Sequence, residues 1–323
     1  MPIAASARNI LLWHVHGSWT SSFVAGAHRY VLPVNDARDQ DGRGLCGRSW
    51  SNAREVPLRQ LADEPVDIVV LQRPEELELA TKWLGRRPGV DVSAVYVEHN
   101  APRPSPADSV HPVAHRGDIT LVHVTHFNRL MWDNGIAPTE VVAHGIADPG
   151  DLYTGELPAA ATMINEPLRR NRIVGADLLP RLAADIPLDV FGLGTDDFAG
   201  ATGGRVRGRG DLRAPHLHEE LARRRVYVHT ARWTSLGLSL LEAMHLGMPV
   251  VAVAATMVPL SVPSEAGVVS ADVDTLAGAI KTFVSDPEAA RAAGKSARHF
   301  ALRHFGIERF LRDWDVLIDR ACA

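Results

Sequence analysis

Short apolar runs alternate with longer amphipathic stretches along the whole chain of 323 residues. Each run is rich in β-branched residues, is bounded by polar residues, Gly or Pro, and has the length of a buried strand. The predicted strands are 9–15, 67–71, 93–98, 119–124, 140–143, 161–165, 188–192, 226–229, 249–253 and 267–269. Because strands separated by helices pair in parallel, the pattern predicts an α/β fold of two tandem, Rossmann-like, doubly wound domains.

Turn-forming residues mark the boundary between the two domains. They cluster from Asp148 to Pro158, between two predicted strands. A boundary of this kind falls where few contacts cross between domains. We therefore assign 1–155 to an N-terminal domain and 156–300 to a second domain.

The end of the chain has a helical pattern that no further strand follows. It begins at Asp286, is interrupted at Gly306 and carries several Phe residues among charges. This segment is too long for one more crossover helix, so we expect it to pack across both halves of the chain. Its Arg residues are also compatible with contact to an anionic membrane, although packing on protein is the favoured interpretation.

Composition excludes several classes of protein. Hydrophobic residues make up 46% of the chain, and 34 Lys and Arg against 38 Asp and Glu give a formal charge of −4. These values exclude a disordered chain and a strongly basic one, so nucleic acid is not an expected partner. The two cysteines, Cys46 and Cys322, form no disulfide framework, and no apolar run has the length of a membrane span. We expect a cytoplasmic protein, with peripheral contact to the inner membrane face as the alternative location.

Some motif-like patterns have simpler structural explanations. The glycines of 42–47 match a dinucleotide fingerprint without the strand that should precede it, so we expect a loop. Gly294-Lys295-Ser296 lacks the first glycine of a P-loop and lies in a helical pattern. Asp272 is expected to cap a helix, and the histidine pairs lack further ligands at zinc spacing, so we expect no metal site.

The most informative stretch is 226–252. It reads as a strand, a loop of small residues, a helix, a Gly-Met-Pro break and a second strand. A ligand crevice forms at the carboxyl end of such strands, and backbone N–H groups at the helix start can bind phosphate or sugar oxygens. We expect Ser235, Leu236 and Gly237 to supply these N–H groups.

Glu242 is the one acid in the apolar part of that helix. A carboxylate among apolar residues needs polar partners. One interpretation is a core Glu that a backbone N–H or an Arg satisfies. The other is a ligand-binding Glu whose two oxygens accept hydrogen bonds from the vicinal diol of a ribose.

The order of residues in 226–252 resembles the C-terminal signature of the retaining, nucleotide-sugar-dependent glycosyltransferases with the GT-B fold, called group 1. The family frame is similar to E-x-F-G-L-x-L-L-E-A-M-x-x-G-x-P-V-V. Glu242 matches the second Glu of that frame, and the other matching positions are Gly237, Ala243, Met244, Gly247 and Pro249. The first Glu is replaced by Thr234, at a position to which the resemblance assigns a contact with the transferred sugar.

Further segments resemble the same family. His99, directly after a predicted strand, is similar to the active-site His that contacts the donor sugar; the alternative is a His that caps a loop. Gly17 and Ser18 resemble the loop that approaches the diphosphate and the acceptor. In the second domain, the resemblance implies donor contacts from Arg169, Arg170 and Arg172 (diphosphate), Gly192 and Gly194 (nucleotide turn), and Leu212 and Arg213 (base). Residues 205–225 hold a surplus of Arg that fits either a solvated face or an anion-facing loop.

The resemblance implies a retaining, metal-independent transfer of a hexosyl group from a UDP- or GDP-linked donor, without a cofactor, in a cleft between the domains. The acceptor would be a sugar, a lipid-linked molecule or another small molecule held by the N-terminal domain. The leaving diphosphate would itself take the acceptor proton, and His99 and Glu242 would be the catalytic residues. The tail, 301–323, would be a closing helix that returns to the N-terminal domain.

Two other functions remain open on the sequence. A nucleotide-sugar-binding protein that has lost turnover is favoured by Thr234. A sugar-nucleotide epimerase or a phosphorylase would need its own acid–base pair or a cofactor lysine, and the chain has only Lys82, Lys281 and Lys295.

Overall fold

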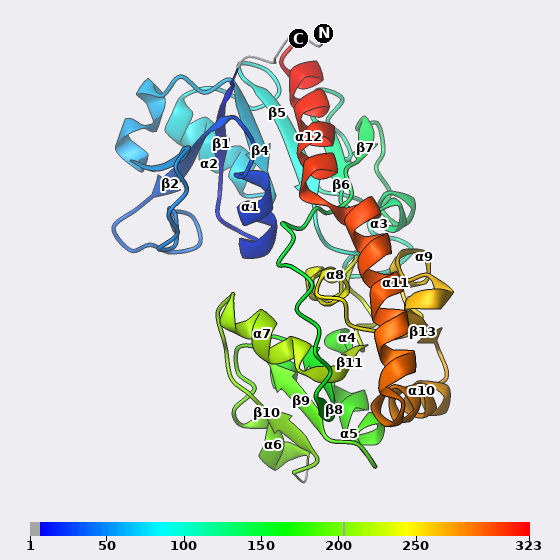
Figure 1. The fold of residues 1–323 in the computed structure, drawn as a ribbon. Helices are drawn as coiled ribbons and strands as arrows, with labels where there is room; N and C mark the ends of the chain where they lie inside the picture. Colours follow the sequence, from blue (N-terminus) through cyan, green and yellow to red (C-terminus); the bar gives the residue numbers. More distant parts are fainter. Residues whose placement is uncertain (1–6, 203) are drawn as a thin grey trace, which may run out of the picture. The chain divides into compact units, whose positions relative to one another are not determined.

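The computed structural model describes residues 7–202 and 204–323, and it divides the chain into two compact units. The first unit is Met1–Gly145 together with Ile307–Ala323, and the second is Ile146–Gly306. Each unit has one parallel sheet with helices packed on it (Figure 1). The predicted pair of doubly wound α/β domains is therefore confirmed.

The strands of the first unit follow the order β3-β2-β1-β4-β5-β6-β7 across the sheet. Their bounds are β1 Asn9–Leu12, β2 Arg29–Val34, β3 Ala53–Pro57, β4 Ile68–Leu71, β5 Ser93–Glu98, β6 Thr120–His123 and β7 Thr139–Val141. The helices are α1 Gly17–Phe23, η1 Leu58–Asp63, α2 Glu76–Leu84, α3 His126–Met131 and α12 Ile307–Ala321. The chain reverses its direction across the sheet between β1 and β4, so a ligand crevice is expected at the carboxyl ends of these two strands.

Aromatic side chains hold α12 on one face of the first sheet. Trp314 of α12 lies 5.8 Å from Trp19 and 4.9 Å from Phe23, both in α1, measured between ring centroids. Phe310 and Trp314 are almost completely buried. In Figure 1 the last helix, in red, runs alongside β5, which it contacts. Burial of rings of this size makes α12 an integral part of the first unit.

The second sheet has the order β10-β9-β8-β11-β12-β13. Its strands are β8 Leu157–Met163, β9 Leu188–Phe191, β10 Val206–Gly208, β11 Arg224–His229, β12 Val250–Val253 and β13 Gly267–Ser270. The helices are α4 Pro167–Val174, η2 Ala176–Leu178, α5 Leu179–Leu182, α6 Phe198–Ala201, α7 His216–Ala222, α8 Leu238–His245, α9 Val258–Ser261, η3 Ser264–Ala266, α10 Val273–Ser285 and α11 Pro287–Phe305. Here the direction reverses between β8 and β11.

Alternation along β11 separates the core from the candidate site. Val226 and Val228 belong to the core cluster under α10, whereas Tyr227 and His229 stack on each other on the opposite face. The pairing of β11 with β8 shifts its register between Arg224 and Val226. Such an irregularity re-aims a side chain, and here it accompanies the turn of Arg224 toward Asp189 on β9.

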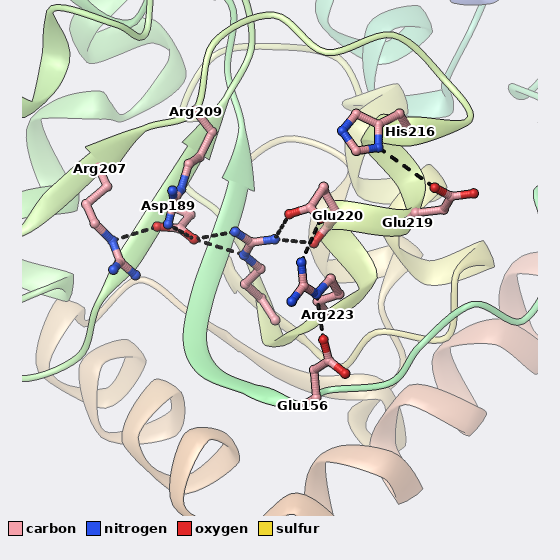
Figure 2. Close-up of polar contacts among 9 residues, drawn as sticks. Glu156, Asp189, Arg207, Arg209, His216, Glu219, Glu220 and Arg223 are labelled. Carbon is pink, nitrogen blue, oxygen red and sulfur yellow. Dashed lines mark hydrogen bonds and ion pairs between the residues drawn. The ribbon is translucent and has the colours of Figure 1, made fainter.

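Three guanidinium groups surround the buried carboxylate of Asp189. Its oxygens accept hydrogen bonds from Arg207 Nε at 2.8 Å, Arg209 Nη2 at 3.1 Å and Arg224 Nε at 2.9 Å. Figure 2 shows Arg207 and Arg209 converging on Asp189. Arg223 pairs with Glu156 and Glu220 in the same view. Two carboxylates from outside residues 205–225, Asp189 and Glu156, therefore offset part of the Arg surplus of this segment.

Close backbone approach explains the glycines around the Gly-Met-Pro break. Gly247 follows α8 with a positive φ of 86°, which favours glycine. Gly294 of α11 lies so close to this break that a Cβ atom on it would stand 2.0 Å from the carbonyl oxygen of Gly247. The contact between α11 and the break therefore requires a residue without a side chain at position 294.

Gly294→Ala should consequently destabilise the second unit. The added methyl group meets backbone atoms that cannot rotate away, so we expect a loss of about 1–3 kcal/mol of unfolding free energy. Gly278→Ala is the matched control, because nothing lies within 4 Å of its Cβ position in α10. Urea denaturation of both variants measures the difference, and equal stability of the two would contradict the close approach.

The structural interpretations of the glycine motifs and of Asp272 are confirmed. Gly42 and Gly47 lie in the loop between β2 and β3, and Gly294 lies inside α11. Asp272 caps α10, where its carboxylate accepts hydrogen bonds from the N–H groups of Asp274 and Thr275. No helix of the described residues is long and apolar enough to cross a membrane.

The hydrophobic pattern missed three strands, β2, β3 and β10. Pro33 in β2 argues against a central strand, because proline lacks the N–H group of the ladder. The exposed face of β3 is polar, and β10 has only 3 residues. These strands are stabilised by pairing with their neighbours rather than by an apolar run of their own.

Candidate active site

The carboxyl ends of β8 and β11 carry the predicted donor-binding segments of the second unit. After His229 the chain forms the loop 230–237, and α8 begins at Leu238 with Gly237 as its N-cap. No side chain caps this helix, so its first N–H groups are open to a ligand. The helix start therefore lies just beyond the predicted donors Ser235 and Leu236, which are buried in the loop.

His229 lies directly beneath the N-cap of α8. A Cβ atom on Gly237 would stand 2.6 Å from Cε1 of His229, so the imidazole and the backbone are in close contact. Burial lowers the pKa of His229 to about 4, which keeps the ring neutral at physiological pH. Among the described residues its Nε2 atom has no hydrogen-bond partner. In the chain order, only its place at the end of a strand distinguishes this residue.

Glu242 lies on the second turn of α8 with 18% of its side chain exposed. Its Oε2 atom lies 3.8 Å from Nε2 of His218, which comes from α7. No backbone N–H group and no Arg of the described residues is paired with this carboxylate, so the structure does not provide the partners of a satisfied core Glu. The carboxylate of Glu242 therefore remains available to a ligand beside the uncapped start of α8. Thr234 lies half-buried in the preceding loop.

The three predicted Arg residues lie on α4, which follows β8. Arg169 is paired with Glu166, and Nη1 of Arg172 lies 3.2 Å from Oδ2 of Asp177. Both side chains are largely exposed, at 70% and 75% respectively. Arg170 is half-buried on the same helix. These three cations are therefore gathered beside the carboxyl end of β8, each within reach of solvent.

The remaining donor-binding candidates also follow strands of this sheet. Gly192 and Gly194 form the turn after β9 with positive φ angles of 131° and 72°. This turn packs on the end of β8, where the N–H of Leu193 donates to Oδ1 of Asn165 at 3.0 Å. Leu212 and Arg213 lie in the loop between β10 and α7. The structure thus places all of these candidates on loops or helices that follow the strands of one sheet.

His99 of the first unit is held by a glutamine at the neighbouring strand end. Gln72 follows β4, and its Nε2 atom donates to the carbonyl oxygen of Trp13 at 2.8 Å. Its Oε1 atom therefore faces Nε2 of His99, at 3.1 Å. Because an amide oxygen only accepts, Nε2 of His99 must carry the proton, which leaves Nδ1 as an acceptor.

Two more histidines lie against His99. The ring centroid of His16 is 4.0 Å from that of His99, and the ring of His144 is 6.5 Å away. Trp19 covers the edge of the group at 5.0 Å from His99. Burial, with repulsion among the rings, lowers the pKa of His99 well below its usual range, and the pKa of His16 falls to about 4. Sequence analysis selected only His99, because nothing in the chain order brings these three residues together.

Acid should therefore weaken the first unit. An unfolded His titrates near pH 6.5, whereas His16 and His144 titrate at about 4 and about 3 when folded. Between about pH 6.5 and pH 4 the unfolded chain binds more protons, so stability should fall by about 1.4 kcal/mol per pH unit for each such His. Urea unfolding at pH 7 and pH 5 measures this slope, and His144→Gln should reduce it. An unchanged slope in that variant would contradict the lowered pKa of His144.

Gly17 and Ser18 begin α1, directly after the segment that follows β1. A Cβ atom on Gly17 would lie 3.7 Å from Nε2 of His14, and Ser18 is exposed. Both residues lie at the same edge of the first sheet as His99 and Gln72. Among the residues that the structure describes, no group of three or more His, Cys, Asp or Glu side chains could hold a metal ion.

Comparisons with known proteins agree with this geometry. Residues 206–300, which include β11, the loop 230–237 and α8 with Glu242, match the family model described as glycosyl transferases group 1. This segment of the chain is therefore similar to the group 1 glycosyltransferases. Its two parallel sheets have the GT-B fold of structures that it matches over nearly its whole length. A search of curated proteins found no match.

Solved structures share the fold of this chain at low sequence identity. A sucrose-phosphate synthase from Thermosynechococcus elongatus is 17% identical with a TM-score of 0.71, over 97% of this chain and 98% of that one. Alr3699/HepE from Anabaena, in complex with UDP, is 14% identical with a TM-score of 0.71, over 97% and 100%. TarM from S. aureus, in a complex that includes UDP, is 16% identical with a TM-score of 0.65, over 78% of this chain and 55% of TarM.

Proposed function

We propose that this protein is a glycosyltransferase that moves a sugar from a nucleoside diphosphate donor to an acceptor with retention of the anomeric configuration. The observation that carries the proposal is Glu242, whose carboxylate has neither an Arg nor a backbone partner and lies beside the open start of α8. A ribose diol supplies the two donors that this carboxylate lacks. UDP is the first nucleotide to test, because the HepE structures hold UDP or UDP-glucose; GDP is the second.

The diphosphate would bind to the N-terminal N–H groups of α8 and to the Arg residues of α4. Both supply positive charge to phosphate oxygens, and a guanidinium can bind two of them in one plane. Stabilisation of the leaving diphosphate by these groups would make the transfer independent of a metal ion. The leaving group would then accept the proton of the acceptor hydroxyl, so that no protein nucleophile is required.

His99 would contact the transferred sugar. Its Nε2–H group is engaged by Gln72, so the free Nδ1 lone pair would accept a hydrogen bond from a sugar hydroxyl. The neutral state that burial enforces suits this role, because an imidazolium has no lone pair to offer. Gly17 and Ser18 would line the path of the acceptor on the first unit.

A thermal-shift panel of UDP-, GDP-, dTDP- and ADP-sugars tests the proposal. A donor present at 100 times its dissociation constant should stabilise the protein by about 2.7 kcal/mol. The same panel is run with EDTA, which should leave both the shift and the transfer unchanged. If no donor raises the melting temperature, or if Mg²⁺ or Mn²⁺ is needed to restore transfer after EDTA, the proposal is wrong.

Thr234 gives weight to a second candidate, a protein that binds the nucleotide sugar without turnover. A neutral hydroxyl offers less to the sugar than the carboxylate of the family frame. Release of nucleoside diphosphate, measured beside binding of the intact donor, separates the two candidates. An epimerase would instead convert the sugar while it stays attached to the nucleotide.

Thr234→Glu should change the preference for the donor sugar. The new carboxylate can accept charge-assisted hydrogen bonds from sugar hydroxyls, while the ribose contact at Glu242 is untouched. We expect altered relative turnover across a panel of sugars on one nucleotide, with nucleotide affinity nearly unchanged. Thr234→Ser is the control that keeps the neutral hydroxyl. If the relative turnover stays the same, position 234 does not contact the sugar.

A further inference from the structure

An open pocket of about 690 Å³ lies in the first unit, in the loop that connects β2 to β3. Arg38, Arg43 and Arg48 line it together with Glu55 and the exposed thiol of Cys46. The loop is anchored at the carboxyl ends of the central strands: Nε1 of Trp13 donates to the carbonyl oxygen of Asp41 at 3.1 Å. The pocket therefore opens at the ligand-binding edge of this sheet.

The three guanidinium groups of the pocket are not equally neutralised. Arg38 forms a bidentate pair with Glu55, with both N–O distances at 2.8 Å. Glu55 also accepts a hydrogen bond from the N–H of Leu45, so its oxygens are engaged. Within residues 7–202 and 204–323, neither Arg43 nor Arg48 forms an ion pair within 4.0 Å. Two acids of the same loop are engaged elsewhere: the carboxylate of Asp39 accepts hydrogen bonds from Asn35 and from the N–H of Asp41, and the carboxylate of Asp41 pairs with Arg73.

A half-buried imidazole, that of His14, adjoins these two cations. The charges of Arg48 and Arg43 both add to the effect of burial in lowering the pKa of His14. Nδ1 of His14 is buried without a hydrogen-bond partner among the described residues. The ring lies 5.5 Å from Trp50 of the same loop, and its Nε2 atom faces Gly17. His14 thus connects the pocket to the loop at which the acceptor would bind.

We propose that this pocket binds the anionic group, a phosphate or a carboxylate, of the acceptor. The proposal rests on the transferase function, and it narrows the acceptor to a charged molecule. Two guanidinium groups without a carboxylate partner suit an oxyanion, which each can bind through two oxygens. The nucleotide of the donor is assigned to the second unit, which leaves these cations of the first unit for the acceptor.

Cys46 provides a test that needs no donor and no turnover. The chain has two cysteines, so Cys322→Ser leaves Cys46 as the only thiol. Its reaction with the neutral reagent N-ethylmaleimide is timed with glucose 6-phosphate, glucuronate, glucose, inorganic phosphate or UDP. A ligand that excludes the reagent slows the reaction about tenfold at ten times its dissociation constant. We expect glucose 6-phosphate or glucuronate to protect, and glucose, inorganic phosphate and UDP to protect much less.

Two double variants test whether Arg43 and Arg48 bind the anionic group. Arg43→Gln with Arg48→Gln should weaken protection at least about tenfold, since each removes a charge-assisted contact. Arg29→Gln with Arg59→Gln removes the same charge from exposed positions of this unit and should leave protection unchanged. Rates are compared as ratios with and without ligand, which cancels any change in thiol reactivity.

Several results would overturn the proposal. They are equal protection by glucose, by inorganic phosphate or by UDP, absence of protection by any ligand, and protection that survives in the Arg43 and Arg48 double variant. Since the measurement uses no donor sugar, these results differ from a failure of the transferase function. That failure would appear as absent donor binding while the pocket still protects Cys46.

Discussion

Asp189→Asn should lower the unfolding free energy of the second unit by about 3–5 kcal/mol. The carboxylate is 1% exposed and accepts hydrogen bonds from three Arg side chains. Asn is neutral and offers only one acceptor oxygen, so the almost fully buried guanidinium of Arg224 would lose the more buried of its two carboxylate partners and keep only Glu220. Urea denaturation followed by far-UV circular dichroism measures the loss.

The matched control is Asp185→Asn. Asp185 pairs with Lys281, but its side chain is 63% exposed, and exposed pairs contribute little. We therefore expect a change below about 1 kcal/mol in the control. If both variants lose the same unfolding free energy, the burial of Asp189 does not determine its contribution to stability.

Glu242→Gln should weaken the affinity for the nucleotide by about tenfold or more. A hydrogen bond from a ribose hydroxyl to a carboxylate contributes about 1.5–3 kcal/mol, and the neutral amide forms a weaker one. The fold should survive, because Glu242 is part-exposed and no Arg of the described residues depends on it. Calorimetric titration with UDP or GDP measures the affinity.

Glu265→Gln is the control for this second prediction. Glu265 is an exposed acid of the same unit, so its replacement changes the net charge equally. Affinity should stay at the wild-type value in this variant. If Glu242→Gln also keeps wild-type affinity, the ribose is bound elsewhere and the ribose-binding role assigned to Glu242 is wrong.

The sequence could predict those parts of the fold and site that are encoded locally. The alternation of buried strands and amphipathic helices indicated the fold, and the order of residues from 226 to 252 placed Glu242 and Gly237 at a helix start. Local helix caps such as Asp272 could be predicted equally well. In each case the residues that interact are neighbours in the chain.

Features that depend on distant contacts could not be predicted. Asp189 meets Arg207, Arg209 and Arg224 only because β9, β10 and β11 come near each other in the sheet and the ladder of β11 slips by a residue. The contact between the rings of His16 and His99 has the same origin in strand order. The start of α8 at Leu238 also depends on packing, since Gly237 must lie against the buried ring of His229.

The most direct test of the central claim is a transfer reaction followed by proton NMR. The protein is incubated in EDTA with the donor that binds best and with charged and neutral acceptors. We expect release of nucleoside diphosphate together with a new glycosidic bond that keeps the anomeric configuration of the donor. A product of inverted configuration would contradict retention. A donor that binds but stays intact with every acceptor would contradict the transfer itself.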